Sequence, residues 1–455
     1  MHKPVIILGA GITGLALGYF LQQRGIDFLI LEKDARPGGH IRSFREGPYL
    51  MDVGPNSLQA QHPHVQQLID ELNLQAQQVF ARPTASKRYV FRKGRLHPIP
   101  MDPKALLSSR LLSFQAKWQL LKEPFIKPDK QQTAESIASF TRRRLGEEWL
   151  DYVVNPFVGG VFAGDPERLH LRSAFPMIYR LEQEFGSLLK GMKRLAREKK
   201  NTAGHRGGLF SFQSGMQTLP DVLYVRLREQ VLLQTAAVSI HRRSAGFELV
   251  CTGSSGKEVF TCDRLVSTIP AYAAADLLDE AFAWVKPHLR AIIYPPVMVV
   301  FATYPRKAIR QPLDGFGFLV PAKENLSFLG AIWNSAIFPE RSPDDQAAFT
   351  LFAGGMRHPE IAGAAHPAWV ARMLKEFEQI MGIDHPPVFA RQWFWQQAIP
   401  QYDLYYPEHE LAFQKLEQQN PGLYLAGNYR GGISVGNCVV SAYELAEHIA
   451  SRLKD

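Results

Sequence analysis

The sequence predicts an α/β protein, α+β overall: a discontinuous, doubly wound nucleotide-binding domain with one inserted mixed-sheet domain and one inserted helical domain. Three observations in its 455 residues predict this fold class. A strand–glycine turn–helix–strand pattern opens the chain, strand-like runs near 265–270 and 423–428 return much later, and helical periodicity dominates residues 101–200. Strands that return after long, unlike segments indicate a domain assembled from separate pieces.

The first element is a glycine turn between two apolar runs. Residues 5–8 end in Gly9-Ala10-Gly11-Ile12-Thr13-Gly14, and an amphipathic stretch leads to a second apolar run, 28–31, and then to Glu32. Glycines let the backbone approach a pyrophosphate at a helix N-terminus, and an acid about 20 residues further on accepts hydrogen bonds from a ribose diol. Strand, spacing and acid agree, so this window predicts a Rossmann-like dinucleotide site.

A second group of glycines extends that site. Gly38, Gly39 and Arg42 follow the acid directly, and a Gly54-Pro55-Asn56-Ser57 turn comes soon after. Adjacent glycines allow close backbone approach to a ligand, and an arginine can contact a phosphate. The alternative is an ordinary turn with a surface arginine, which the preceding strand–helix–strand unit disfavours. The GG-x-x-R-S run resembles that of the FAD-binding members of the amine-oxidase-like flavoproteins, not that of NAD dehydrogenases.

The middle of the chain predicts the two insertions. Residues 87–97 indicate a β-hairpin that turns at Lys93-Gly94, and several strand-like runs between 291 and 334 indicate a separate sheet. Residues 101–200 alternate basic residues with apolar ones, including Trp118 and Phe125, a pattern that suits a membrane interface. A helical subdomain that packs those apolar faces inward is the alternative. A helix is expected over 368–381, with Pro367 just ahead of it.

These patterns divide the chain into six segments. We expect the nucleotide-binding domain to comprise 1–82, 201–270 and 386–455, the mixed-sheet domain 83–100 and 271–385, and the helical domain 101–200.

Composition narrows the class of protein. The chain is 46% hydrophobic and 21% charged, as expected for a globular protein with a large core, and its three cysteines show no CxxC spacing, so neither a disulfide framework nor a metal site is expected. The net charge of +9 comes without a nucleic-acid motif. Anionic lipid, an anionic small molecule, or simply a basic soluble protein can account for it. We expect no spanning helix and no leader peptide, and a location in the cytoplasm or peripheral on the cytoplasmic face of the membrane.

Taken in order, the motifs resemble the protoporphyrinogen oxidases, oxygen-dependent flavoenzymes of haem synthesis, over nearly the whole chain. The motifs are GAGITGLA, GPNS, KRYVFRKGRLHPIP, NPFVGGVFAGDPERLHLRSAFP, FSFQSGMQTLP, GFGFLVP, IWNSAIFPER, AIPQY and LAGNYRGGISVGNCV. The AGDP and RSAFP stretches discriminate most, because generic amine oxidases are not expected to carry them. The resemblance implies non-covalent FAD, and a thioether to Cys438 has no support in it.

The resemblance also implies which residues hold the flavin. Val238 is similar to a residue whose backbone meets the adenine, and Trp395 to an aromatic beside the isoalloxazine; plain core is an equal alternative for both. Residues 433–435 would direct the positive end of the last helix at the flavin pyrimidine. The implied FAD contacts are Gly9, Ala10, Gly11, Ile12, Thr13, Gly14, Glu32, Lys33, Gly39, His40, Arg42, Gly54, Pro55, Asn56, Ser57, Val238, Trp395, Gly427, Ile433, Ser434 and Val435.

For the substrate, the resemblance implies that Arg88 pairs with a propionate and that Gly160, Leu319 and Phe338 line the macrocycle, with Asn56 beside the reacting carbon. No catalytic side chain is expected, because hydride passes from a methylene bridge to flavin N5, three times per porphyrin, with O2 as acceptor and H2O2 as product. Coproporphyrinogen III is the nearest alternative substrate. A generic amine oxidase or desaturase, or a non-catalytic flavin or porphyrin binder, is more distant. Expected partners are the porphyrinogen, O2 and a membrane surface, without nucleic acid; a homodimer is allowed.

Overall fold

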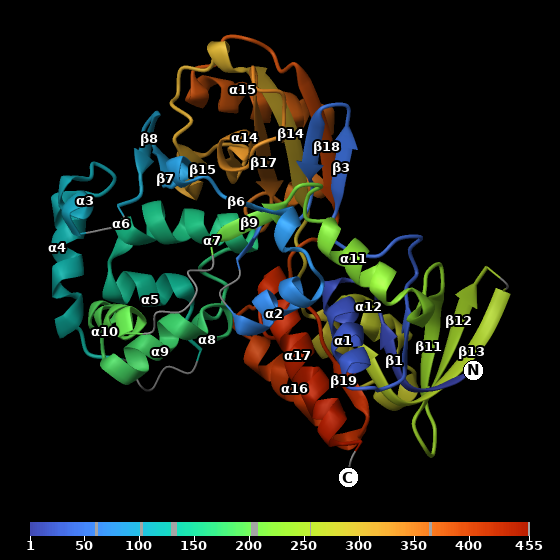
Figure 1. Ribbon diagram of the computed structural model, residues 1–455. Coiled ribbons are helices and arrows are strands. Elements are labelled where there is room, and N and C mark those ends of the chain that lie inside the picture. Colours follow the sequence, from blue (N-terminus) through green and yellow to red (C-terminus); the bar gives the residue numbers. More distant parts are fainter. Residues whose placement is uncertain are drawn as a thin grey trace.

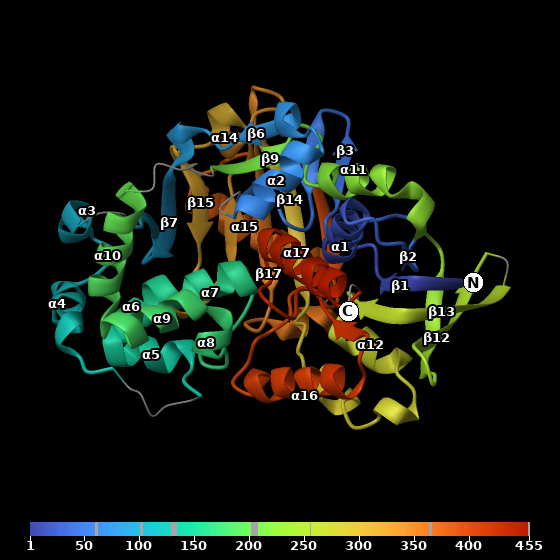
Figure 2. The same cartoon turned by 60° about the horizontal axis from the view of Figure 1, so that its bottom comes forward.

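Two large sheets and a helical lobe make up the protein (Figures 1 and 2). The computed structural model describes residues 1–59, 62–100, 103–128, 134–201, 208–254, 256–363 and 366–453. In Figure 1 the first sheet lies at lower right, the second at the top and the helical lobe at the left. Within these ranges no helix is long and apolar enough to cross a membrane.

The first sheet gathers strands from both ends and the middle of the chain. Its order is β10-β2-β1-β13-β12-β11, with β19 also pairing with β13. β1, β2, β10, β13 and β19 pair in parallel, whereas β11, β12 and β13 form an antiparallel extension. The strands are β1 (His2–Leu8), β2 (Phe28–Leu31), β10 (Val231–Leu232), β11 (Ala236–Arg242), β12 (Phe247–Gly253), β13 (Gly256–Ser267) and β19 (Leu423–Leu425).

Alternation along β1 explains why helices cover both faces of this sheet. Val5 and Ile7 belong to one core cluster, and Ile6 and Leu8 to another, because successive side chains of a strand point to opposite faces. The first cluster packs against α1 (Ile12–Gln23), α2 (Pro63–Glu71), α11 (Thr218–Arg226) and α17 (Val435–Ser451). The second packs against α12 (Ala271–Leu277), α13 (Lys286–Arg290) and α16 (Tyr406–Gln419). This arrangement confirms the predicted fold class.

The second sheet has seven strands in the order β18-β14-β17-β16-β15-β7-β8. One face packs against α15 (His366–Met381) through a cluster that includes Phe318, Phe349 and Phe377. The strands are β7 (Lys87–Arg92), β8 (Arg95–Pro98), β14 (Val297–Pro305), β15 (Gly315–Leu319), β16 (Gly330–Ile332), β17 (Gln346–Gly354) and β18 (Phe389–Trp395), and α14 (Asn334–Ile337) follows β16. Two small sheets, β3 (Ser43–Glu46) with β4 (Tyr49–Asp52), and β5 (Leu58–Gln59), β9 (Leu209–Phe212) and β6 (Gln78–Phe80), complete the strands.

Several local predictions are confirmed, and one segment lies elsewhere than expected. β7 and β8 form the predicted hairpin, with positive φ at Lys93 (49°) and Gly94 (76°) as a tight turn requires. β13 returns in parallel beside β1, and the helix expected over 368–381 begins at His366. β18, by contrast, pairs with β14 in the second sheet, so the boundary expected at 386 falls too early. The remaining boundaries stay predictions.

Buried polar contacts join the β3–β4 hairpin to the segment between α14 and β17. Asp52 at the end of β4 and Arg341 in that segment are each 2% exposed at their side chains and lie 3.3 Å apart. Burial raises the pKa of the Asp52 carboxyl, although Arg341 opposes this rise. Asn334 Nδ2 donates to Asn56 Oδ1 at 3.0 Å across the same junction.

The helical lobe is held together by a buried ionic cluster. Arg144 Nη1 donates to Glu123 at 2.9 Å and Arg144 Nε to Glu182 at 2.7 Å, with the arginine fully buried. Glu123 also accepts backbone N–H groups of residues 188 and 189, so the cluster ties three segments together. The helices are α3 (Pro103–Ser108), α4 (Phe114–Lys122), α5 (Ile137–Arg144), α6 (Glu147–Trp149), α7 (Asn155–Phe162), α8 (Leu171–Ala174), α9 (Pro176–Phe185) and α10 (Leu188–Asn201).

Replacing the buried arginine should destabilise the lobe strongly. Arg144→Met leaves two buried carboxylates without this cation, which typically costs about 3–5 kcal/mol of unfolding free energy. Denaturant unfolding followed by circular dichroism measures the loss. Arg142→Met is the matched control: Arg142 also pairs with two glutamates, but at the surface, where its loss costs about 1 kcal/mol or less. Equal losses from the two variants would contradict the role assigned to burial.

Candidate active site

A cleft of about 600 Å³ opens at the carboxyl ends of β1 and β2, beside the start of α1. The crevice outside the carboxyl ends of parallel strands is where doubly wound sheets bind nucleotides. Its walls come from the glycine turn, the end of β2, the loop after β13, Trp395 and the segment before α17.

The glycine turn leaves the start of α1 open toward this cleft. Gly9 has φ +99°, and a Cβ at Gly14 would lie 2.0 Å from the Gly9 carbonyl oxygen, so both positions require glycine. Gly11 is the N-cap residue, and no side chain caps the helix. A Cβ at Gly11 would meet nothing within 4 Å, which shows that open space adjoins the backbone there. The free N–H groups of the first turn therefore form a site for an anion such as a pyrophosphate.

Glu32 holds the end of β2 next to that turn. Its Oε2 accepts from the Ala10 N–H at 2.7 Å and its Oε1 from the Asp34 N–H at 2.9 Å. The residue is 8% exposed, and burial raises the pKa of its carboxyl, whereas the two backbone hydrogen bonds oppose this. A carboxylate has about four acceptor sites, so two remain for a ribose diol.

Trp395 forms the wall at the other end of the cleft. Its Nε1 donates to the Val53 carbonyl at 2.7 Å, the His40 ring packs edge-on at 4.8 Å and the Arg42 guanidinium lies 5.2 Å from the ring centroid. Burial lowers the pKa of His40, so its imidazole is neutral at pH 7. These contacts fix the indole rigidly beside the space for a ligand.

Most of the predicted cofactor residues line this one cleft, and the open helix end, the acid and the glycine cradle fit an FAD. Those that line it are Gly9, Gly11, Ile12, Thr13, Glu32, Lys33, Gly39, His40, Arg42, Pro55, Trp395, Ile433 and Val435. Ala10, Gly14, Gly54, Asn56, Ser57 and Ser434 do not line the cleft but each lies within two residues of one that does, and their roles stay predictions.

Val238 and Gly427 are two further predicted cofactor residues that do not line the cleft. The Val238 side chain is 54% exposed, and the preceding Ala236 and Ala237 line the cleft instead. Gly427 lines a second cavity on the other side of the chain. For Val238, a backbone contact to an adenine stays a prediction.

Sequence reasoning missed several residues of the wall. Thr268, Ile269 and Pro270 follow β13, so the expected return of that strand could have indicated them. Asn428 follows β19, so the expected return of a strand near 423–428 could have indicated it as well. Tyr272 carries no such signal, because only the tertiary arrangement brings it to the cleft.

Cys438 also lines the cleft, from the first turns of α17. Burial raises the pKa of its thiol to about 11. The thiol is therefore protonated at neutral pH and is a poor nucleophile, which favours non-covalent cofactor binding.

One face of the second sheet continues from Trp395 toward Arg88. Cross-strand pairs Trp393–Val299, Val299–Phe352, Phe352–Gly330, Gly330–Leu319 and Leu319–Val90 form a row over six strands. Directly paired residues share a face, so the row is one apolar surface. Arg88 lies two residues before Val90 on the same face, with its guanidinium 5.5 Å from the Phe316 ring. Arg88 is exposed.

Gly160 faces this surface from α7. A Cβ at Gly160 would lie 2.5 Å from Leu319 Cδ2, so the helix approaches the sheet as closely as glycine allows. The structure thus brings together Arg88, Leu319 and Gly160, three of the residues predicted for the substrate.

Phe338 and Asn56, the other two residues predicted for the substrate, do not lie on this sheet face. Phe338 is 2% exposed in the core between the second sheet and α15, with Arg341 5.4 Å from its ring, so it offers almost no surface to a ligand. Phe352 is a half-buried aromatic on the face of the sheet that carries Trp395, and it packs in one cluster with Trp395 and Leu329. The alternation along β17 could have indicated it. Asn56 is 7% exposed behind Pro55, and its amide is held by Asn334.

Comparisons with known proteins agree with this geometry. The family model described as flavin containing amine oxidoreductase matches residues 12–450. The chain is 32% identical to protoporphyrinogen oxidase 2, chloroplastic/mitochondrial, of Arabidopsis thaliana, over 99% of this chain and 94% of the relative. It is 24% identical to coproporphyrinogen III oxidase of Bacillus subtilis (strain 168), over 96% of each. A solved structure of a protein from Exiguobacterium sp. 255-15 covers 99% of both chains at 24% identity with a TM-score of 0.82.

Neutralising the acid of the cleft should weaken cofactor binding. Glu32→Gln removes the charged acceptor for a ribose diol, and a hydrogen bond to a charged group contributes about 1.5–3 kcal/mol, so the FAD dissociation constant should rise at least about tenfold. Quenching of flavin fluorescence on reconstitution of the apoprotein measures it. FAD affinity of the unmodified protein should also fall as the pH drops through the raised pKa of Glu32, since protonation removes the acceptor.

The control is Asp27→Asn, just ahead of the other end of β2, where the carboxylate pairs with Lys3 at the surface. Its FAD affinity should equal that of the unmodified protein. A Glu32→Gln protein with unchanged affinity and unchanged pH dependence would remove Glu32 from the cofactor site.

Proposed function

The chain belongs to the flavin-containing amine oxidoreductase family, and we propose that it oxidises protoporphyrinogen IX to protoporphyrin IX with O2 as the acceptor. It is an FAD-dependent oxidoreductase. The relative from Arabidopsis thaliana supports the substrate, being named a protoporphyrinogen oxidase and aligned over almost the whole of both chains.

The observation that carries the proposal is the apolar sheet face that runs from Trp395 at the cofactor cleft to Arg88. A flat, apolar macrocycle with carboxylate arms requires an apolar wall and a cation at its edge. Gly160 of α7 lies directly against Leu319 on that wall, and the exposed Arg88 guanidinium offers bidentate contacts to a propionate.

FAD, when bound in this cleft, would supply the hydride-accepting chemistry, and O2 would take up the electrons of each two-electron oxidation as H2O2. The protein positions the cofactor and the substrate, and it excludes water from the site. The open end of α1 and Glu32 hold the nucleotide half of the cofactor, and Trp395 with His40 and Arg42 fixes the other wall. The amino-terminal end of α17 adjoins the same cleft and stabilises negative charge there. No side chain is needed as a strong base, because the cofactor carries the difficult step.

Coproporphyrinogen III is a second candidate substrate, because the Bacillus subtilis relative is named for it and aligns over 96% of this chain. The two substrates differ in the number of propionates, so the supply of cations around the sheet face discriminates between them. The greater identity to the plant relative favours protoporphyrinogen.

Initial rates on both porphyrinogens in air test the function and Arg88 together. We expect faster turnover of protoporphyrinogen IX, followed by porphyrin fluorescence. Arg88→Ala should raise KM about 10- to 100-fold and change kcat little, because the contact is made in the ground state and the transition state alike.

Arg95→Ala is the matched control, since Arg95 is also exposed and lies on β8 of the same hairpin. Its KM should match the unmodified enzyme. An FAD-loaded protein that forms neither porphyrin would overturn the function, and an unchanged KM for Arg88→Ala would remove Arg88 from the site.

We further propose that the helical lobe binds the surface of a membrane, on its cytoplasmic face. Phe114 and Phe125 are 82% and 86% exposed, and Trp118 and Leu121 are more than half exposed. These residues belong to α4 and the turn after it, on the outer side of the lobe (Figures 1 and 2). Lys122 and Lys127 are exposed beside them. Exposed aromatics flanked by lysines are typical of interfacial helices on anionic lipid. A homodimer stays a prediction.

Sedimentation with vesicles of anionic phospholipid tests the lobe. The double variant Phe114→Asp/Phe125→Asp should lower the partition coefficient at least about tenfold, since burying one phenylalanine contributes about 1.5–3 kcal/mol. Val225→Asp/Val388→Asp, which alters exposed valines outside the lobe, should bind as the unmodified protein does. Absence of vesicle binding at both low and high salt would contradict the proposal.

A further inference from the structure

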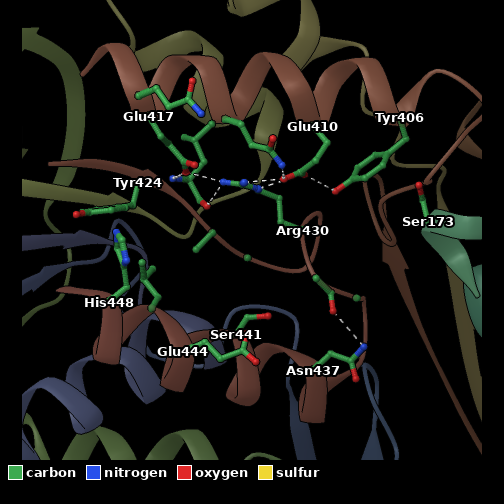
Figure 3. Close-up of a pocket in the computed structure, with 18 of the residues that line it drawn as sticks. Ser173, Tyr406, Glu410, Glu417, Tyr424, Arg430, Asn437, Ser441, Glu444 and His448 are labelled. Atoms are coloured by element: carbon green, nitrogen blue, oxygen red, sulfur yellow. Dashed lines mark hydrogen bonds and ion pairs between the residues drawn. The ribbon is translucent and has the colours of Figure 1, made fainter. Parts of the chain in front are cut away.

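Residues 427–433 form a wall one chain thick between two cavities. Asn428 and Ile433 line the cofactor cleft, whereas Gly427, Arg430 and the glycines 431 and 432 line a second cavity of about 1210 Å³ between α16 and α17. Figure 3 shows this second cavity, with Arg430 between Glu410 and Glu417 on α16 and with Asn437 and Ser441 across from them on α17. The side chains that hold this wall from the second cavity therefore determine the position of the residues that line the cofactor cleft.

Tyr402 closes the wall segment on itself. Its hydroxyl donates to the Asn428 carbonyl at 2.7 Å and accepts from the Gly432 N–H at 3.0 Å. The residue is 2% exposed. One hydroxyl thus satisfies both ends of the segment that faces the cleft, where an unpaired buried backbone group would be costly.

Arg430 attaches the middle of the segment to α16. It donates to Glu410 at 2.7 Å, to Glu417 at 2.6 Å and to the Leu425 carbonyl at 2.6 Å. The two carboxylates raise the pKa of the guanidinium, which is largely buried. Glu417 also accepts from the Leu425 N–H at 2.8 Å, so the same helix holds the end of β19.

Tyr406, on the first turn of α16, adds a third attachment. Its hydroxyl donates to the Tyr429 carbonyl at 2.7 Å. The two tyrosines and Arg430 contact backbone carbonyls within residues 425–429. This stretch comes directly before the part of the segment that ends at Ile433 in the cleft.

We propose that Tyr402, Tyr406 and the Arg430–Glu410–Glu417 group are positioning residues that set the affinity and midpoint potential of the flavin through this wall. None of these side chains lines the cofactor cleft; they act through Asn428 and Ile433. The inference rests on the flavin-binding part of the proposed function and not on the identity of the substrate.

The electrostatics give the direction of the effect. Ile433 is followed by the N-cap Ser434, whose side chain accepts from the Asn437 N–H at 3.0 Å, so the wall segment leads directly into the positive end of α17. A positive helix end beside the flavin stabilises the negative charge of the reduced form. Loosening the wall weakens that stabilisation, so the midpoint potential becomes more negative and FAD binds less tightly.

Tyr402→Phe in the 455-residue protein tests the two hydrogen bonds of the Tyr402 hydroxyl, because the ring is kept and only the hydroxyl is lost. We expect the FAD dissociation constant to rise about tenfold on reconstitution of the apoprotein, as the loss of two hydrogen bonds implies. Dye-coupled reduction of the holoenzyme should give a more negative midpoint potential. Hydrogen exchange at the Gly432 amide should accelerate. Glu410→Gln should shift affinity and potential in the same direction, and provides the test if Tyr402→Phe does not fold.

Tyr429→Phe is the matched control in the same segment. The Tyr429 hydroxyl is buried and has no hydrogen-bond partner among the described residues, so its removal should leave FAD affinity and potential unchanged. Wild-type affinity and potential in both Tyr402→Phe and Glu410→Gln, or an equal shift in Tyr429→Phe, would overturn the proposal. These measurements need no porphyrinogen, so failure of the substrate assignment gives a separate result.

Discussion

The open amino-terminal end of α1 is the constraint on which the rest of the structure depends. Its first-turn N–H groups have no side-chain cap and face a cleft, so this helix end is a site at which an anion is stabilised. Gly9 and Gly14 are required for the turn that delivers the chain to this helix, and Glu32 holds the neighbouring strand end against Ala10. The other parts of the molecule supply either more of the cleft wall or the surface next to it.

Each insertion adds one element beside this cleft. The second sheet contributes Trp395 to the cofactor wall and an apolar face beyond it, and the helical lobe covers part of that face through the glycines of α7. The lobe itself depends on the fully buried Arg144, because its partners Glu123 and Glu182 are also buried, and of the two only Glu182 pairs with a second cation among the described residues, Arg143. Within this lobe, Arg144 therefore contributes to stability, whereas the glycines of α7 contribute to specificity.

The sequence predicts well where a motif is local and poorly where a tertiary contact decides. The glycine turn, the hairpin at Lys93 and the returning strand β13 follow from spacing alone. β18 could not be assigned, because nothing in a short strand says which sheet edge it joins. Phe338 follows the short helix α14 and packs into the core, whereas Phe352 on β17 packs beside Trp395; only the tertiary arrangement distinguishes the two. Tyr402 ends the AIPQY motif, but nothing in that motif indicates its hydrogen-bond partners, which lie 26 and 30 residues away.

The contact between the β3–β4 hairpin and the segment that leads into β17 has a consequence for motion. Asp52 and Arg341 are both buried, and Asn56 and Asn334 share a hydrogen bond beside them. Pulling the hairpin away from that segment would break a buried ion pair and leave charges without partners, at a cost of several kcal/mol. Hinge motion at this contact is therefore disfavoured. Because the carbonyl of Val53, the residue after Asp52, accepts a hydrogen bond from the indole N–H of Trp395, the same contact also limits movement of the cleft wall.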